Sequence, residues 1–200
     1  MDAQRQAEAR LVKVLRGAYS GELAAALAYA GHARSVRDAD EAAEIRRVRA
    51  EELEHRERVG AMLAALGAGP SPERERVFRA IGAAIAAFCR VGGWFAPMYG
   101  AARLERGNVG EYELAARHAL DAGRAEWVDD LLTMAEVEHD HERWFREKAA
   151  SHPLWRVFPH WEPLPPREHI RRSLTIERGA RGLAPEAPGA RPTPVSSGTA

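Results

Sequence analysis

Two short motifs in this chain place a glutamate and a histidine at a spacing that suits metal binding. They are Glu52-Leu53-Glu54-His55 and Glu136-Val137-Glu138-His139, and both read Glu-aliphatic-Glu-His. Residues three apart lie on the same face of an α-helix, so the first and last residues of each motif can reach one centre. Carboxylate oxygens and imidazole nitrogens are ligands of transition metals such as iron and manganese. The pattern therefore predicts that both motifs bind metal.

A further glutamate precedes each motif at nearly the same distance. Glu22 lies 30 residues before Glu52, and Glu105 lies 31 residues before Glu136. Four buried carboxylates and two imidazoles would repel one another or take up protons unless cations neutralised them. We therefore predict a centre for two metal ions, in which one or two glutamates bridge the ions. The expected ligands are Glu22, Glu52 and His55 mainly for one ion, and Glu105, Glu136 and His139 for the other.

The ligand types favour two iron ions, with manganese as the alternative. Zinc fits less well, because a closed tetrahedral zinc site does not need six ligands. A ligand set of carboxylates and imidazoles leaves open positions for dioxygen or peroxide. The chain has a single cysteine, Cys89, which excludes an internal disulfide and a redox-active cysteine cluster. An electron donor is therefore expected to be a separate protein or a small molecule.

A tyrosine follows each upstream glutamate by seven residues, Tyr29 after Glu22 and Tyr112 after Glu105. Seven residues make about two helical turns, so each tyrosine is expected on the face of its own glutamate, ~10 Å along the axis. We predict that both tyrosines act beside the metal ligands in catalysis. The alternative is that they are core tyrosines with satisfied hydroxyl groups. The matched positions also indicate two related helical hairpins that face each other.

The sequence has an alanine-rich helical periodicity and no convincing strand pattern. Asp38 is typical of a helix N-cap, Gly67 and Pro70 are typical of a helix end, and Gly92-Gly93 interrupt a helical segment. The expected helices cover residues 3–35, 38–66, 73–90, 94–120 and 125–149. The two hairpin turns, at 36–38 and 121–123, fall roughly midway between ligands, which antiparallel helices require to bring those ligands level.

These features predict an all-α fold, a ferritin-like four-helix bundle over residues 1–150, with residues 73–90 as a helical crossover between its second and third helices. Glu111, on the third bundle helix, is a reserve candidate for the role of Glu105. Residues 151–178 contain several prolines and aromatic residues and are expected to form an extended arm packed on the bundle. Residues 179–200 are rich in Ala, Gly, Pro, Ser and Thr and are expected to be a disordered tail.

Charge and hydropathy narrow the expected environment. The chain has 29 basic and 29 acidic residues, so nucleic acid is not expected as a partner. The lone cysteine and a polar N-terminus without the apolar segment of a secretory signal favour the cytoplasm. Residues 80–102 carry only one charged side chain, Arg90, and glycine and proline interrupt them too often for a membrane span. They are expected to pack in the core or in a homodimer, with peripheral contact to the inner membrane face as the alternative.

The segments around the predicted ligands resemble the demethoxyubiquinone hydroxylase family of the ferritin-like superfamily, over roughly residues 10–145. Residues 21–31 are similar to that family's first ligand motif, G-E-x-x-A-x-x-x-Y-A-G. Residues 50–55 and 136–140 are similar to its second and fourth motifs. The third motif is matched more loosely: Glu105 and Tyr112 agree with it, whereas Arg106 replaces a second glutamate and Glu111 stands where the family has a histidine.

This resemblance implies an oxygen-dependent di-iron hydroxylase or monooxygenase with a small organic substrate, for which a quinone is a candidate, and an external electron donor. The ligand residues also leave two other functions open. One is a ferritin- or rubrerythrin-like protein that oxidises ferrous iron or consumes peroxide, and the other is a metal-free helical interaction module. An apolar tunnel from the centre to the surface of residues 80–102 would favour the hydroxylase, and a closed polar approach would favour iron or peroxide chemistry.

Overall fold

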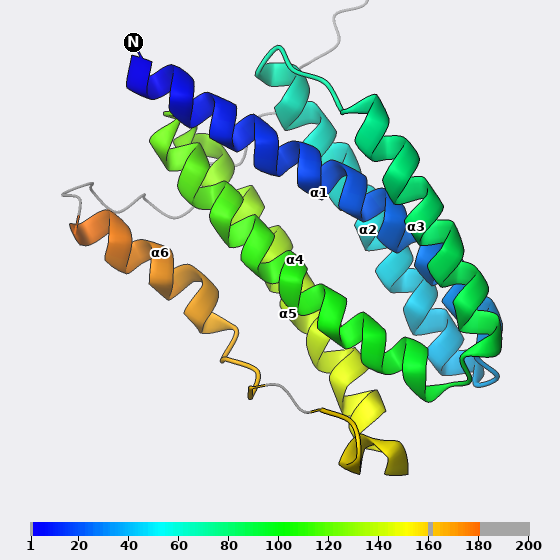
Figure 1. The fold of residues 1–200 in the computed structure, drawn as a ribbon. Coiled ribbons are helices and arrows are strands. Elements are labelled where there is room, and N and C mark those ends of the chain that lie inside the picture. The colour runs from blue at the N-terminus through cyan, green and yellow to red at the C-terminus, as the bar shows by residue number, and fades with distance from the viewer. Residues whose placement is uncertain (1, 160–161, 181–200) are drawn as a thin grey trace, which may run out of the picture.

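The computed structural model describes residues 2–159 and 162–180 (Figure 1). The long helices of this part are α1 (Asp2–Ser35), α2 (Ala39–Ala65), α3 (Pro72–Val91), α4 (Phe95–Asp121), α5 (Val128–Ala150) and α6 (Glu168–Ala180). Two short 3-10 helices, η1 (Ala125–Trp127) and η2 (Pro153–Arg156), flank α5. The described residues contain no strand, which confirms the expected all-α class. The first five helices lie within a few residues of their expected positions.

Helices α1, α2, α4 and α5 form a bundle, and α3 and α6 lie outside it on opposite sides (Figure 1). Helix α1 packs against α2 and α4, and α4 packs against α5. Because α2 runs antiparallel to α1 and α5 antiparallel to α4, each pair is a hairpin. Helix α3 connects the first hairpin to the second and runs along the outside of the bundle, from the end of α2 back to the level where α2 begins. Helices α2 and α4 therefore run in the same direction.

Particular residues begin and end these helices. The Asp38 side chain accepts hydrogen bonds from the backbone N–H groups of Asp40 and Glu41, at 3.0 and 2.9 Å, and so caps α2. Gly67 follows α2 with a φ of 64°, and Gly123 follows α4 with a φ of 74°. Glycine adopts this left-handed conformation at little cost, and it ends a helix sharply. The turns therefore lie where the sequence signals placed them.

Two apolar clusters fill the bundle, and all four bundle helices contribute to each. The first contains Leu11, Leu63 and Leu131, and the second contains Ile45 and Phe145. Along each bundle helix, buried acidic side chains stand between the residues of the two clusters. The apolar interior is therefore interrupted by one polar layer in the middle of the bundle.

Helix α3 approaches α1 closely through small residues. A Cβ atom on Gly31 would lie 2.5 Å from Ala86, and a Cβ atom on Gly82 would lie 2.6 Å from the carbonyl oxygen of Ala24. Such distances leave no room for a side chain, so the two glycines let the helix backbones pack together. Helix α3 is thereby held on the outside of α1, and much of its other side is exposed.

Residues 80–102 divide between two environments. Their α4 part, which includes Phe95, Met98 and Ala102, is buried in the core, as the sequence predicts. Their α3 part is mostly exposed and places Phe88 and Val91 on the surface. None of the helices in the described part of the chain combines the length and the hydropathy needed to cross a bilayer.

The C-terminal segment corrects one expectation. The sequence predicts an extended arm over residues 151–178, whereas the structure contains η2 and, from Glu168, helix α6. Ile170 and Leu174 of α6 are buried against the first apolar cluster, and their spacing of four residues puts them on one helix face. The prolines before α6 dominated the sequence pattern and obscured this short amphipathic helix. The expected tail, residues 179–200, lies outside the described residues except for 179 and 180, which end α6.

Candidate metal centre

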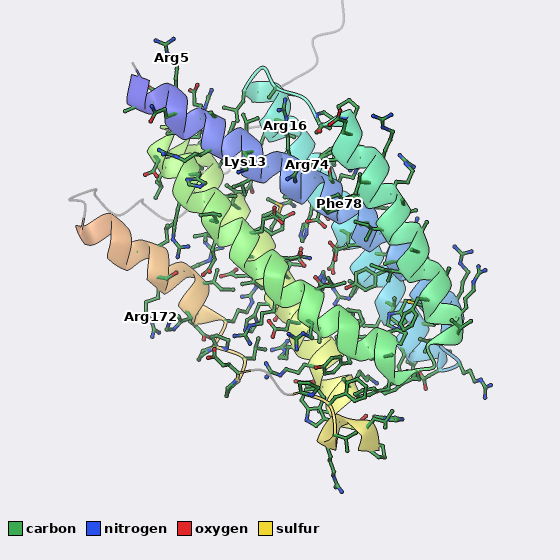
Figure 2. All side chains as sticks on the ribbon, viewed as in Figure 1. Arg5, Lys13, Arg16, Arg74, Phe78 and Arg172 are labelled. Atoms are coloured by element: carbon green, nitrogen blue, oxygen red, sulfur yellow. The ribbon has the colours of Figure 1, made fainter. Side chains whose placement is uncertain are left out.

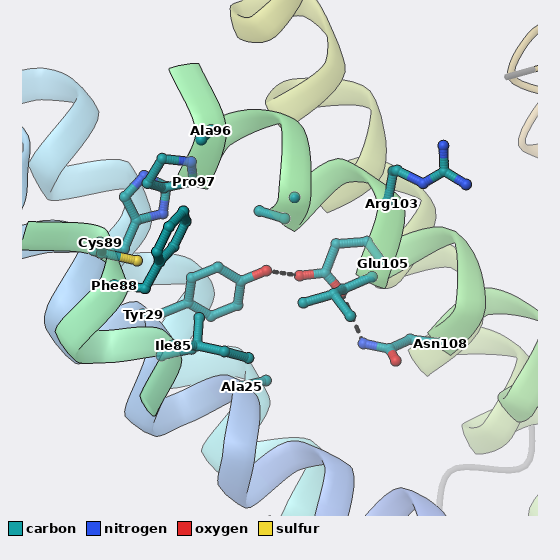
Figure 3. A pocket seen from close by; sticks show the side chains of 15 residues that line it. Ala25, Tyr29, Ile85, Phe88, Cys89, Ala96, Pro97, Arg103, Glu105 and Asn108 are labelled. Carbon is teal, nitrogen blue, oxygen red and sulfur yellow. Dashed lines mark hydrogen bonds between the residues drawn. The ribbon is translucent and has the colours of Figure 1, made fainter. Parts of the chain in front are cut away.

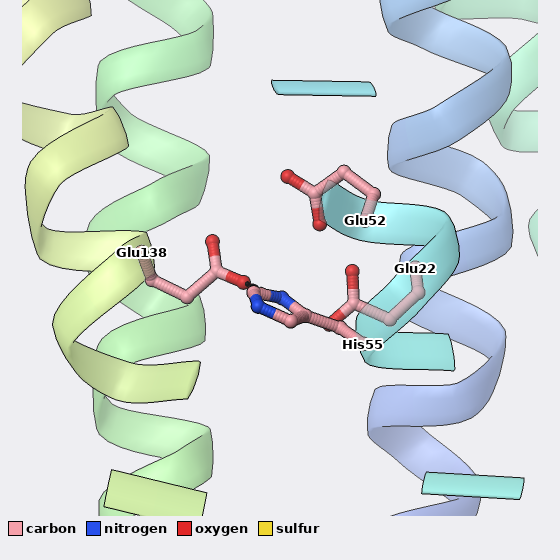
Figure 4. Close-up of side chains that lie close together, drawn as sticks. All are labelled: Glu22, Glu52, His55 and Glu138. Atoms are coloured by element: carbon pink, nitrogen blue, oxygen red, sulfur yellow. Dashed lines mark hydrogen bonds and ion pairs between the residues drawn. The ribbon is translucent and has the colours of Figure 1, made fainter. Parts of the chain in front are cut away.

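Acidic and histidine side chains from all four bundle helices meet in the polar layer, and Figure 4 shows four of them facing one another across the bundle. Each is at most 4% exposed. They are Glu22 of α1, Glu52 and His55 of α2, Glu105 of α4, and Glu138 and His141 of α5.

The ligand atoms of these side chains form two groups, each compact enough to surround one metal ion. In each group these atoms lie within 4.8 Å of one another. The groups are Glu22, Glu52, His55 and Glu138, and Glu52, Glu105, Glu138 and His141. Because Glu52 and Glu138 belong to both groups, their carboxylates can bridge two ions. One further glutamate and one histidine then remain for each ion, which is the ligand pattern of dinuclear carboxylate bundles.

The structure corrects the predicted ligands of α5. Glu136 and His139 belong to neither group. The Glu136 carboxylate accepts a hydrogen bond from Arg171 Nε at 2.6 Å, and His139 Nε2 lies 2.7 Å from the carbonyl oxygen of Pro165. Both side chains therefore face the C-terminal segment. A shift of two residues turns a side chain by about 200° around a helix, so these residues cannot face the centre when their neighbours two positions later do.

The pair that α5 brings to the centre forms an overlapping Glu-x-x-His motif, Glu138 with His141. Glu138 lies seven residues after Leu131 and seven before Phe145, and both of these are fully buried. Seven residues bring a helix back to nearly the same face, so this apolar stripe was the signal that could have identified Glu138. The other four predicted ligands lie in the centre: Glu22, Glu52, His55 and Glu105.

Several ligand atoms in the centre have no hydrogen-bond partner among the described residues. They are Glu22 Oε2, both carboxylate oxygens of Glu52, Glu138 Oε2 and His141 Nδ1. A buried polar atom without a partner costs on the order of 1–3 kcal/mol, and more when it is charged. Cations at the centre would give these atoms partners, so the side chains fit two bound metal ions.

The acid–base properties of the centre also favour cations. Burial and then the charge of Glu138 raise the pKa values of Glu52 and Glu105 well above the usual value. Burial alone would raise the pKa of Glu138 too, but the nearby His141 and His55 rings outweigh it and hold that pKa far below its usual value. Without metal, the centre therefore holds protons tightly on Glu52 and Glu105 and a buried negative charge on Glu138. Metal ions that bind there must displace the protons, which makes binding pH-dependent.

An outer carboxylate orients His141. Its Nε2 donates a hydrogen bond to Glu51 Oε2 at 2.7 Å, and Glu51 also accepts a hydrogen bond from Arg47. The other ring nitrogen, Nδ1, lies 3.4 Å from Glu138 Oε2 and 3.5 Å from Glu52 Oε1, so it is the nitrogen available to a metal. Carboxylates behind metal-binding histidines commonly fix the ring in this way. No motif spacing singles out Glu51, because it lies on the outer side of α2, beside Glu52.

Tyr29 and Tyr112 connect the two hairpins. Tyr29 of α1 donates a hydrogen bond to Glu105 Oε1 of α4, and Tyr112 of α4 donates one to Glu22 Oε1 of α1. Burial and then the charge of the accepting glutamate raise both tyrosine pKa values well above the usual value, so the hydroxyls stay protonated and act as donors. Asn108 donates from Nδ2 to the other oxygen of Glu105, at 2.8 Å. Each tyrosine thus orients a glutamate of the opposite hairpin, which the spacing along one helix does not show.

Glu111, the reserve ligand candidate, belongs to neither group. It packs toward Gly17 of α1, where an added Cβ atom would lie 2.5 Å from Glu111 Oε1 and 3.4 Å from Nη1 of Arg74. Burial, followed by the negative charge of Glu22, raises the pKa of Glu111 to about 7. Glu111 is therefore a half-buried acid between α1, α3 and α4.

An apolar cavity of about 500 Å³ adjoins the centre between α1, α3 and α4. Tyr29 and Glu105 line the end that meets the centre, and Figure 3 shows the Tyr29 hydroxyl and Asn108 directed at the Glu105 carboxylate. The walls are mostly alanine and larger apolar side chains such as Phe88. His32, which belongs to none of the motifs in the sequence, adds a buried polar group to the wall. Burial lowers its pKa to about 4, so the ring is uncharged at neutral pH.

Comparisons of this chain with protein-family models, with curated proteins and with solved structures found no match.

Replacing His141 by alanine should lower the amount of bound metal, whereas replacing His139 by alanine should not. His141 contributes a ligand atom to one group, and His139 instead contacts the C-terminal segment. We expect about two irons per chain in the parent and in His139→Ala purified with ferrous iron, and one or none in His141→Ala, by elemental analysis. Retention of iron in His141→Ala together with its loss in His139→Ala would contradict the ligand assignment on α5.

Replacing Glu111 by glutamine should reduce the pH dependence of stability in the metal-free protein. The pKa of Glu111 is raised from 4.5 to about 7 in the folded state, so the folded state holds this proton more tightly than the unfolded chain. Its contribution is therefore fully present below pH 4.5 and is lost as the pH rises to about 7. In urea unfolding of chelator-treated protein, the stability of Glu111→Gln relative to the parent should increase over this pH range and then stay constant. A difference in stability between Glu111→Gln and the parent that does not change over this pH range would refute this assignment.

Proposed function

We propose that the protein is a di-iron carboxylate oxidoreductase, and specifically a hydroxylase that uses dioxygen to oxidise a small apolar molecule. The observation that carries this proposal is the pair of carboxylates, Glu52 and Glu138, shared by two groups of ligand atoms in the bundle. Four carboxylates and two imidazoles without a thiolate suit iron or manganese better than a closed zinc site. The α3 connection between the two hairpins adds support for a ferritin-like bundle.

Two iron ions held by these side chains would supply the redox chemistry that activates dioxygen. In a hydroxylation, one oxygen atom is inserted into a C–H bond of the substrate and the other becomes water. This reaction consumes two electrons and two protons for each substrate molecule. We assign the electrons to an external protein or small-molecule donor.

Side chains beside the centre hold the glutamate ligands in fixed orientations. Tyr29 and Asn108 each donate to one oxygen of Glu105, and Tyr112 donates to Glu22. One glutamate of each ligand group is thereby held in place. The two tyrosines donate from the opposite hairpin, and Asn108 donates from the same helix as Glu105. Because the donors are already oriented, the ligands need little reorganisation when charge changes at the centre.

The apolar cavity supports an organic substrate in preference to ferrous iron or peroxide. A hydrated ion or peroxide would lose hydrogen bonds to water on entering a mostly apolar passage, whereas an apolar molecule would not. The cavity ends at Tyr29 and Glu105, so a bound molecule would lie beside one ligand group. Its apolar walls would also keep water from the reacting atoms. The resemblance to demethoxyubiquinone hydroxylases makes a quinone the first substrate to test. We place the protein in the cytoplasm, where it could also contact the inner face of the cell membrane.

A variant that narrows the cavity should lose substrate turnover while it keeps its iron. Gly100 lines the cavity and has open space beside it, so leucine at this position would occupy the cavity. We expect Gly100→Leu to bind the parent amount of iron and to lower quinone-dependent oxygen consumption at least tenfold, measured with an oxygen electrode and a chemical reductant. Gly110→Leu is the matched control, since Gly110 is an exposed glycine of the same helix, has open space beside it, and does not line the cavity.

Two other results would favour the competing functions. Oxygen consumption that depends on ferrous iron alone and is unchanged in Gly100→Leu would favour an iron-oxidising protein. Absence of bound iron in the parent purified with iron supplied would favour the metal-free interaction module.

A further inference from the structure

His32 contributes a buried nitrogen atom to the wall of the cavity beside the metal centre. Its side chain lines the cavity and is only 2% exposed. The Nε2 atom of the ring is buried and has no hydrogen-bond partner among the described residues. A buried polar atom without a partner is unfavourable. A molecule that enters the cavity and provides a partner for Nε2 would therefore bind more tightly than one that does not.

Aromatic neighbours hold the His32 ring in place. It stacks on Tyr29, with the ring centroids 6.5 Å apart, and on Phe145, with the centroids 5.9 Å apart. Tyr29 and Phe145 also stack on each other, with the centroids 5.4 Å apart. Because two neighbours fix the ring, less entropy is lost when its nitrogen forms a hydrogen bond with a ligand.

The other polar groups in the buried wall are less suited to hold a ligand. The Tyr29 hydroxyl donates to Glu105, and the other carboxylate oxygen of Glu105 accepts a hydrogen bond from Asn108. Cys89 lines the cavity as well, and burial raises the pKa of its thiol, so it stays protonated and bonds weakly. His32 is therefore the group in this wall that is best suited to distinguish one ligand from another.

The charges around the cavity favour an uncharged ligand. Burial lowers the pKa of His32 to about 4, so its ring carries no charge at neutral pH. Arg103 lines the cavity but is exposed, and its guanidinium donates a hydrogen bond to Tyr99. Charged side chains such as Arg5 and Arg172 project outward from the helices (Figure 2). A charged group that entered the cavity would lose its hydration without gaining a buried counter-charge from His32.

The position of His32 on α1 separates it from the metal ligands. It follows Glu22 by ten residues, ~15 Å along the helix axis, and follows Tyr29 by one turn. Tyr29 is the residue whose hydroxyl contacts Glu105 at the centre. A molecule bound to His32 by its polar group would therefore extend its apolar part along the cavity toward Glu105.

We propose that His32 determines which molecules this cavity binds, and that it selects an apolar molecule with one uncharged hydroxyl group that pairs with Nε2. A hydroxyl group can donate or accept a hydrogen bond, so it pairs with either neutral form of the imidazole. The inference rests on the proposed function for the reaction of the bound molecule, whereas the binding itself does not require iron.

The test is equilibrium dialysis of chelator-treated protein against 2-naphthol and against naphthalene. The two probes share an apolar ring system and differ by one hydroxyl group. His32→Phe keeps an aromatic ring that can stack on Tyr29 and Phe145 but removes Nε2. We expect it to lower the affinity for 2-naphthol about tenfold and to change the affinity for naphthalene by less than about twofold. His32→Leu also removes the nitrogen and should give the same result.

Two further variants and one further probe serve as controls. His118→Phe is the matched control, because His118 of α4 does not line the cavity, and it should bind both probes like the parent. Gly100→Leu should weaken the binding of both probes, since leucine at this position would occupy the cavity. The anion 2-naphthoate should bind the parent at least about tenfold more weakly than 2-naphthol does. Circular dichroism confirms that each variant folds.

Any of five results would overturn the proposal. They are no binding of 2-naphthol to the parent, equal loss of both probes in the His32 variants, loss of 2-naphthol in His118→Phe, unchanged binding in Gly100→Leu, and binding of 2-naphthoate as tight as that of 2-naphthol.

Failure of the proposed function would give a different pattern. A parent that holds no iron, or that consumes no oxygen with a quinone, but that prefers 2-naphthol through His32 would support this inference and reject the proposed reaction. A parent that turns over a quinone but shows no effect of His32 on the two probes would do the reverse.

Discussion

The structure depends on the burial of four carboxylates and two imidazoles in one layer of an otherwise apolar bundle. Glu52 and Glu138 stand at the centre of this layer, and both oxygens of Glu52 lack a partner among the described residues. Apolar clusters close the layer on both sides, so water cannot easily solvate these groups. Such a layer is unfavourable unless protons or metal ions neutralise it. The ligand geometry, the raised pKa values and the tyrosine donors all follow from this constraint.

The two hairpins meet this constraint in matching ways. Each provides one glutamate from its first helix and a Glu-x-x-His pair from its second. Tyr29 and Tyr112 then connect each hairpin to the glutamate of the other, so the hairpins are joined through the centre. Helix α3 carries the chain from one hairpin to the other and, because it packs outside α1, also provides a wall of the cavity and an exposed surface. The connection that the bundle requires thus also gives access to its centre.

The sequence predicts the helices well because their ends have local causes. Asp38 caps α2, and Gly67 and Gly123 end helices in a conformation that favours glycine. The centre is predicted less completely because α5 contains two overlapping Glu-x-x-His pairs. Glutamate and histidine are three residues apart in both pairs, so this spacing does not distinguish them. Only the buried apolar residues seven positions before and after Glu138, Leu131 and Phe145, mark the pair that faces inward. The cross-hairpin tyrosine bonds and the hydrogen bond from His141 to Glu51 arise from contacts between helices, which spacing along one helix cannot reveal.

The most direct measurement of the central claim is anomalous X-ray diffraction at the iron absorption edge, from crystals of the protein purified with ferrous iron. The account predicts two anomalous peaks about 3.5–4 Å apart, as in other dinuclear sites, with both peaks beside Glu52 and Glu138. One peak should also adjoin His55, and the other His141. Absence of anomalous density in the bundle, or density beside Glu136 and His139 on the outer face of α5, would contradict it.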